Sequence, residues 1–158
     1  MKLGGVIKMK KSDWLTLGGK LATRIVKDAD KGISQDGKGE PFSPYKTSYA
    51  IKKALGKVGA KGVSVSRQIS PPNLRLTGKM LDSIKAQNPT TESVEILYAD
   101  GEKVMGNAKP PARLKKASRN IYGLNEPNTA FIQEFIESKY NSKIKRFVAE
   151  VLEFDIKI

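Results

Sequence analysis

The side chains in this sequence that could do chemistry are Asp, Glu, Lys, Ser and Tyr, because the chain contains no Cys and no His. Without Cys there is no thiolate nucleophile, no disulfide framework and no zinc finger. Without His there is no Ser-His-Asp triad and no imidazole base near neutral pH. The segment Gly37-Lys38-Gly39 lacks the spacing of a phosphate-binding loop. We therefore expect that the protein is not an enzyme and holds no metal or cofactor.

Acidic residues are densest at Asp28, Asp30, Asp36 and Glu40. A calcium-binding hand needs ligands at alternate positions and a bidentate Glu at the twelfth, and this spacing does not provide them. Carboxylates of this kind are seldom buried. We interpret these four residues as solvated surface charges.

Basic charge is the strongest chemical signal in the 158 residues, where 29 Lys and Arg outnumber 16 Asp and Glu, for a net charge of +13. Two long stretches, 41–81 and 103–119, contain no acidic residue. Such stretches suit contact with phosphate or with an acidic protein surface. The alternative interpretation is a Lys-rich surface that only keeps the protein soluble. The candidate interface or DNA-facing residues are Lys46, Lys52, Lys53, Lys57, Lys103, Lys109, Arg113, Lys115, Lys116 and Arg119.

Helical periodicity predicts two long helices to position these charges. The first covers residues 13–30 with Ser12 as its N-cap, and the second covers 126–148 with Asn125 as its N-cap. Their apolar faces carry Trp14, Leu17, Leu21 and Ile25 in the first helix, and Phe131, Ile132, Phe135 and Ile136 in the second.

Two shorter helices are predicted between them. One runs from Thr47 to about Leu55, and Thr77 can cap the other. The apolar residues are Tyr49, Ile51, Ala54 and Leu55 in the first short helix, and Met80, Leu81 and Ile84 in the second, where we expect them to be buried.

Alternating apolar residues predict the strands. Val94, Ile96 and Tyr98 alternate with other residues across 93–99, and the last eight residues alternate strictly. We expect one domain, residues 1–158, with an α+β fold: a small, mostly antiparallel sheet packed against two long helices. The sheet would also take the N-terminal segment and part of 101–122. Long extended loops or arms are predicted at about 31–46, 56–76 and 101–122.

Four segments of the chain share a recognisable order and spacing. They are Gly39-Glu40-Pro41-Phe42-Ser43-Pro44 followed by Tyr49 and Lys52-Lys53; Leu76-Thr77-Gly78-Lys79-Met80-Leu81-Asp82-Ser83-Ile84; the strand that ends in Tyr98-Ala99; and Arg119-Asn120-Ile121-Tyr122-Gly123-Leu124-Asn125. In this order they resemble the virion morphogenesis or tail-completion proteins of tailed bacteriophages. Asn120 replaces a Pro that is common in that family, and no His follows Tyr98-Ala99.

The resemblance implies a structural protein of the phage neck or tail end, either a tail-completion or a tail-terminator protein, that joins heads to tails. It implies a homo-oligomeric ring, six- or twelve-fold, around the DNA conduit. Its partners would be copies of itself, adjacent neck or tail proteins and passing double-stranded DNA. It would reside in the virion after assembly in the host cytoplasm.

No apolar run approaches the roughly 20 residues of a membrane span, so no membrane partner is expected. The alternative is a free basic nucleic-acid-binding protein.

Overall fold

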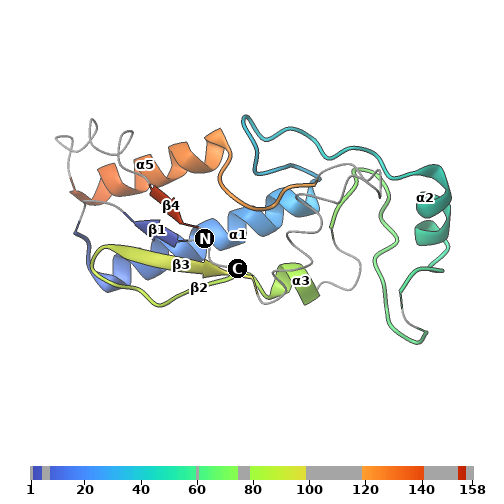
Figure 1. Cartoon of the computed structure of the whole chain (residues 1–158), viewed down its shortest axis with the longest axis horizontal. Helices are drawn as coiled ribbons and strands as arrows, with labels where there is room; N and C mark the ends of the chain where they lie inside the picture. The colour runs from blue at the N-terminus through green and yellow to red at the C-terminus, as the bar shows by residue number, and fades with distance from the viewer. Residues whose placement is uncertain are drawn as a thin grey trace.

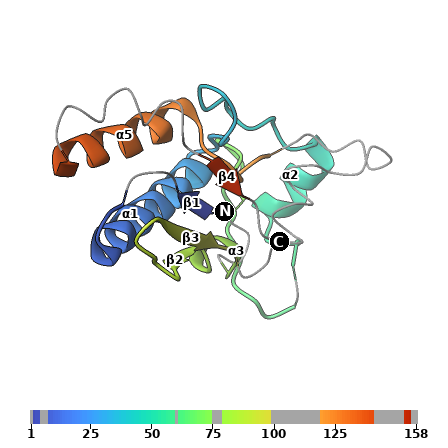
Figure 2. The ribbon, with the colours of Figure 1, turned by 60° about the vertical axis from the view of Figure 1, so that its left-hand side comes forward.

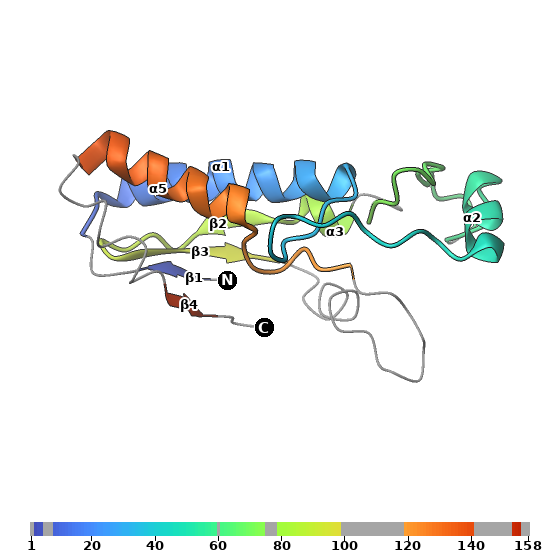
Figure 3. The same ribbon diagram turned by 90° about the horizontal axis from the view of Figure 1, so that it is seen from above.

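A computed structural model of the chain describes residues 2–4, 8–59, 61–74, 79–98, 119–140 and 153–155. The predicted α+β fold is confirmed, with a small antiparallel sheet in one layer and the two longest helices in a second (Figure 3). The described residues form four strands, which in sheet order are β2 (Lys85–Gln87), β3 (Ser93–Leu97), β1 (Lys2–Gly4) and β4 (Glu153–Asp155).

The sheet joins the two ends of the chain. Leu3 of β1 lies opposite Val94 on one side and opposite Phe154 on the other, and each neighbouring pair is antiparallel. The predicted strand at 93–99 corresponds to β3, and β4 lies within the predicted final strand. Strand β2 was not predicted, because its three residues, Lys-Ala-Gln, carry no apolar alternation.

Helix α1 (Lys11–Asp30) covers one face of the sheet (Figures 1 and 2). The predicted apolar face is confirmed, since Trp14, Leu17, Leu21 and Ile25 are buried. The predicted N-cap was wrong: the helix begins at Lys11, so Ser12 lies in its first turn, where its carbonyl accepts a bond from the Thr16 hydroxyl at 2.8 Å.

Helix α5 (Glu126–Tyr140) lies beside α1. Asn125 caps it as predicted, because the backbone N–H of Asn128 donates to the Asn125 side-chain oxygen at 3.0 Å. Ile132, Phe135 and Ile136 are buried against the core. The rest of the predicted helix, 141–148, lies outside the described residues.

The short helices follow the predicted positions. Helix α2 is Thr47–Ala54, and helix α3 is Lys79–Asp82. Leu81 and, just after the helix, Ile84 are buried as expected, whereas Met80 is only half-buried. The predicted cap Thr77 lies outside the described residues, as do residues 101–118. The part of 101–122 that is described, 119–122, forms no strand, because the Asn120 side chain turns the backbone by accepting a bond from the Tyr122 N–H at 2.8 Å.

A buried polar cluster, made of Asp28, Gln35, Asn125 and Asn128, joins three parts of the chain. The Asp28 carboxylate accepts bonds at 3.0 Å from the side-chain amides of both Gln35 and Asn128. Asn128 is fully buried, and Asn125 and Gln35 are nearly so. The interpretation of Asp28 as a solvated surface charge was therefore wrong. Its carboxylate is half-buried, and the side-chain amides of Gln35, Asn125 and Asn128 take the place of part of its water.

Close packing between α1 and the sheet depends on Gly18. A Cβ atom at this position would lie 2.8 Å from the Cβ of Ala86 and 3.1 Å from the Val94 methyl groups. Those contacts are too short for a side chain, so the glycine lets the helix approach β2 and β3. The neighbouring Gly19 has no atom within 4 Å of its would-be Cβ.

We predict opposite effects for alanine at these two adjacent positions. Gly18→Ala should destabilise the protein, because overpacking of the helix–sheet contact, which costs about 1–3 kcal/mol, exceeds the gain of about 0.5–1 kcal/mol that Ala brings to a helix. Gly19→Ala should stabilise it by about 0.5–1 kcal/mol, because Ala favours helix and meets nothing here. Urea unfolding of both variants measures the difference. Equal effects would show that Gly18 does not set the helix–sheet distance.

Candidate interaction surface

The described residues 43–59 and 61–74 form an arm that extends from the two-layer body. Helix α2 lies at its far end, beyond the end of α1 (Figure 1), and does not pack extensively on any other described helix or strand. Of the long loop or arm predicted at about 31–46, the first part, residues 31–42, packs against the body. Ile33 pairs with Pro41 as an isolated β-bridge, and Phe42 is buried.

The inward side of α2 is held by a base cluster that consists of Tyr45, Lys53, Asn73 and Arg119. The Tyr45 hydroxyl donates to the Asn73 backbone carbonyl, which links the two ends of the arm. The Lys53 ammonium donates to the Asn73 side-chain oxygen at 2.9 Å and to the Tyr45 hydroxyl at 3.0 Å. No carboxylate takes part in these contacts.

Arg119 attaches this cluster to the body. Its guanidinium donates to the carbonyl oxygens of Ser43 and Pro44 at 3.0 and 3.3 Å, and it lies 4.7 Å from the centre of the Tyr45 ring. The Lys53 ammonium also lies 4.7 Å from that centre. The Tyr45 ring therefore contacts two cations, and each cation is also bound by neutral oxygens.

The electrostatics of the base cluster follow from burial. Burial, and secondarily the Arg119 guanidinium, lowers the pKa of Lys53 to about 8. Burial also raises the pKa of Tyr45 from its ordinary value. Lys53 is only 1% exposed, so the described chain does not present it to solvent or to a phosphate group. Of the candidate interface residues, Lys53 is the one that the structure buries in the arm.

The outward side of α2 and the loop that follows it expose apolar side chains. Ile51 and Leu55 are 55% and 57% exposed, and they share a helix face because they lie four residues apart. Tyr49, Val63 and Ile69 are also exposed. The apolar side of the predicted helix at 47–55 thus faces outward, while its lysine at position 53 faces inward. Polar oxygens from Tyr45 and Asn73, which come from outside the helix, determine this orientation.

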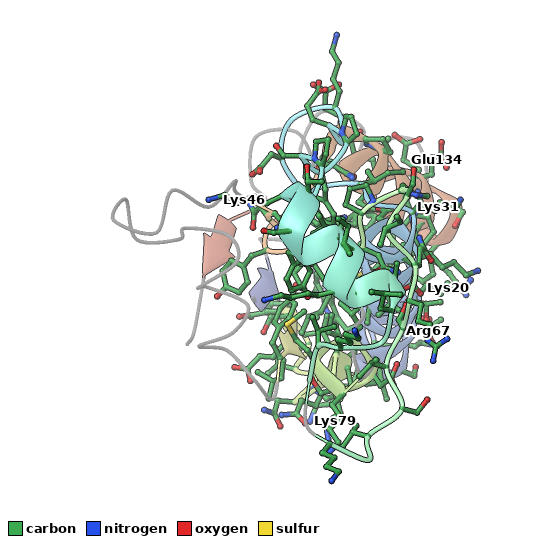
Figure 4. The ribbon with its side chains drawn as sticks, turned by 90° about the vertical axis from the view of Figure 1, so that its right-hand side faces the viewer. Lys20, Lys31, Lys46, Arg67, Lys79 and Glu134 are labelled. Carbon is green, nitrogen blue, oxygen red and sulfur yellow. The ribbon has the colours of Figure 1, made fainter. Side chains whose placement is uncertain are left out.

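The remaining predicted site residues fall into two groups. Lys46, Lys52 and Lys57 are exposed on the arm, and Arg119 is half-buried at its base. Figure 4, viewed from the arm end, shows α2 nearest the viewer, with Lys46 to one side of it and Arg67 toward the other. The second group lies outside the described residues: Lys103, Lys109, Arg113, Lys115 and Lys116.

Sequence reasoning missed two members of the base cluster, Tyr45 and Asn73. Neither residue belongs to a motif or to an apolar pattern in the sequence. Their roles depend on contacts across 28 residues of chain, which no local pattern reports. The exposed apolar residues of α2 were visible in the sequence, but their exposure was not.

Other kinds of site are not found in the described part of the chain. No three acidic side chains gather there as a metal ion would require. No described helix has the length and apolar character needed to cross a membrane. Comparison of the sequence and structure with protein-family models, curated proteins and solved structures finds no match.

We predict that Lys53 makes stability rise with pH. Its pKa of about 8 in the folded state lies below the ordinary 10.5, so the unfolded chain binds more protons between these values. The melting temperature should therefore increase from about pH 8 to about pH 10. Above that, ionisation of tyrosines whose pKa is raised by burial, such as Tyr45, opposes the trend.

The matched control uses the adjacent lysine. Lys53→Met should flatten the increase, whereas Lys52→Met, which changes an exposed side chain, should keep it. Thermal unfolding followed by circular dichroism at a series of pH values makes the comparison. Identical pH profiles for the two variants would rule out a buried, partly neutralised Lys53.

Proposed function

We propose that the chain is a structural virion protein of the phage neck or tail end, which assembles as a ring around the DNA conduit and joins heads to tails. The observation that carries the proposal is the arm, residues 43–74, which exposes aliphatic side chains between cations and contains no acidic residue. Surfaces that expose contiguous apolar side chains mark interaction sites. The work of such a protein is assembly rather than catalysis.

The contacts between two of the resembling segments support this proposal. In the segment Gly39–Pro44, the carbonyl of Pro44 accepts a bond from Arg119, the first residue of the segment 119–125. Gly39 also lies against Asn125, because a Cβ there would be 3.1 Å from the Asn125 side-chain nitrogen. These two segments, about 80 residues apart in sequence, together hold the base of the arm and the start of α5. A family that uses the arm for assembly would need them together.

The alternative function, free nucleic-acid binding, draws on the exposed cations Lys46, Lys52 and Lys57. Phosphate contacts would use these ammonium groups but would leave Ile51 and Leu55 in water. A protein interface would bury both the aliphatic side chains and the lysine stems. The proposed residence is therefore the virion neck or tail, after assembly in the host cytoplasm, with neighbouring subunits and neck or tail proteins as partners.

We predict that charge reversal on the arm blocks the joining of heads and tails. A triple variant, Lys46→Glu, Lys52→Glu and Lys57→Glu, changes three exposed side chains and should fold normally. It should leave separate heads and tails in electron micrographs of infected cells, because the arm no longer fits its partner. The control is Lys8→Glu, Lys11→Glu and Lys38→Glu, which makes the same change of charge on exposed body residues.

Two measurements distinguish the proposal from its alternative. Mass spectrometry of purified particles should detect the chain as a stoichiometric virion component. A gel-shift assay with duplex DNA tests free binding, which should be strong and salt-sensitive if the alternative holds. Particles without the chain, or normal joining by a folded arm variant, would contradict the proposal.

A further inference from the structure

The outward face of α2 combines apolar side chains with positive charge. Ile51 and Leu55 are more than half exposed, and Lys52 follows Ile51 in the helix. The guanidinium of Arg67 lies against the end of α2, because a Cβ atom at Gly56 would be 3.2 Å from the Arg67 Nε atom. The face is therefore a pair of exposed aliphatic side chains with cations beside it.

The positive charge of the arm is not neutralised within the described part of the chain. The sequence has no acidic residue in 41–81, and the exposed arm cations form no ion pair with a described carboxylate. Lys46 and Arg67 lie toward opposite sides of α2 (Figure 4). The exposed cations of the described arm are Lys46, Lys52, Lys57, Lys61 and Arg67. A partner that covers the aliphatic pair therefore meets unpaired positive charge around it.

Three other occupants fit this face less well than an acidic protein does. A nucleic-acid backbone would pair with the cations but would leave Ile51 and Leu55 in water. A second copy of the chain brings a net charge of +13 to a face that is already cationic, and like charges across an interface are unfavourable. Helix α2 has eight residues, whereas many helices that lie on a membrane surface have about 20–30.

We infer that the arm binds an acidic protein segment that presents an apolar stripe flanked by carboxylates. Ile51 and Leu55 pack on the stripe, and the cations beside them pair with the carboxylates. The stems of the lysine side chains extend the apolar contact. Charge complementarity of this kind speeds association and excludes partners of like charge. The inference rests on the proposed function, in which the arm is the assembly surface, and deepens it by naming the chemistry of the partner.

A designed peptide of this chemistry tests the inference with the full chain. The probe is a synthetic amphipathic helix that carries Leu along one face, Glu on both sides of that face and a fluorescent label. Its anisotropy should report saturable binding to the wild-type chain, and the binding should weaken as salt is added. Two control peptides, with Gln in place of Glu or Ser in place of Leu, should bind at least about 10-fold more weakly.

Aliphatic variants of the chain locate the contact on α2. The double variant Ile51→Ser and Leu55→Ser should weaken binding of the Glu peptide by about 10-fold or more, because it removes both apolar anchors. The matched control is Leu15→Ser, which changes a similarly exposed aliphatic side chain on the body and should leave binding unchanged. Circular dichroism checks that each variant is folded.

Charge variants test the second half of the recognition independently. Lys52→Gln with Lys57→Gln should slow association with the Glu peptide and reduce the effect of salt. Lys11→Gln with Lys38→Gln removes the same net charge from exposed body residues and should have a smaller effect on both. Stopped-flow anisotropy at several salt concentrations measures the rates.

Several results would overturn the inference. They are absence of peptide binding, equal binding of the Glu and Gln peptides, or binding that the serine variant of α2 leaves unchanged. Duplex DNA and phosphatidylglycerol vesicles are the competing probes. Tighter binding of either one, lost in the same serine variant, would assign the face to nucleic acid or to a membrane. So would self-association in analytical ultracentrifugation that this variant abolishes assign it to a second copy.

The peptide assay and the virion role can fail separately. If the peptide does not bind but purified particles contain the chain, the proposed virion role stands and only the chemistry of the partner is wrong. If the peptide binds as expected but particles lack the chain, the acidic-partner surface stands and the virion role is wrong.

Discussion

The Asp28 carboxylate lies half-buried between α1 and α5, where side-chain amides take the place of water around it. Asn128 also donates to Gln35 at 2.8 Å and accepts from Arg24 at 2.7 Å, so the amides are themselves satisfied. A buried polar group left without a partner costs about 1–3 kcal/mol. The three chain segments that supply these groups are therefore held together as one unit, because displacing any one of them would strand the others.

The position of the arm follows from that polar cluster. Two hydrogen bonds fix the position of Gln35. Its backbone N–H donates to the Asn120 carbonyl at 2.8 Å, and its side-chain amide donates to the Asp28 carboxylate. Asn120 is next to Arg119, which holds the carbonyls at the start of the arm. These hydrogen bonds, together with the peptide bond between residues 119 and 120, connect the polar cluster of the body to the base cluster. The arm therefore leaves the body in a defined direction.

Helix α2 then shows how a polar contact can decide which face of a helix is exposed. Lys53 satisfies the oxygens of Tyr45 and Asn73, and its burial turns Ile51 and Leu55 outward. Each buried large aliphatic side chain is worth about 1.5–3 kcal/mol, so this orientation forgoes stabilisation in the isolated chain. The same surface becomes favourable when a partner covers it. An exposed apolar face that is fixed by buried polar bonds is suited to association between subunits.

The sequence by itself determined the features that depend on neighbours along the chain. These are the apolar face of α1, the alternation in β3, the Asn125 cap and the positive charge of the arm, which contains no acidic residue. These are set by helix and strand periods and by local hydrogen bonds. The tertiary structure alone decided that Gly18 contacts the sheet, that amides bind the half-buried Asp28 carboxylate and that Lys53 is buried. Each of these depends on atoms from residues 20 to 100 positions away in the chain, and a local pattern carries no information about which distant groups will meet.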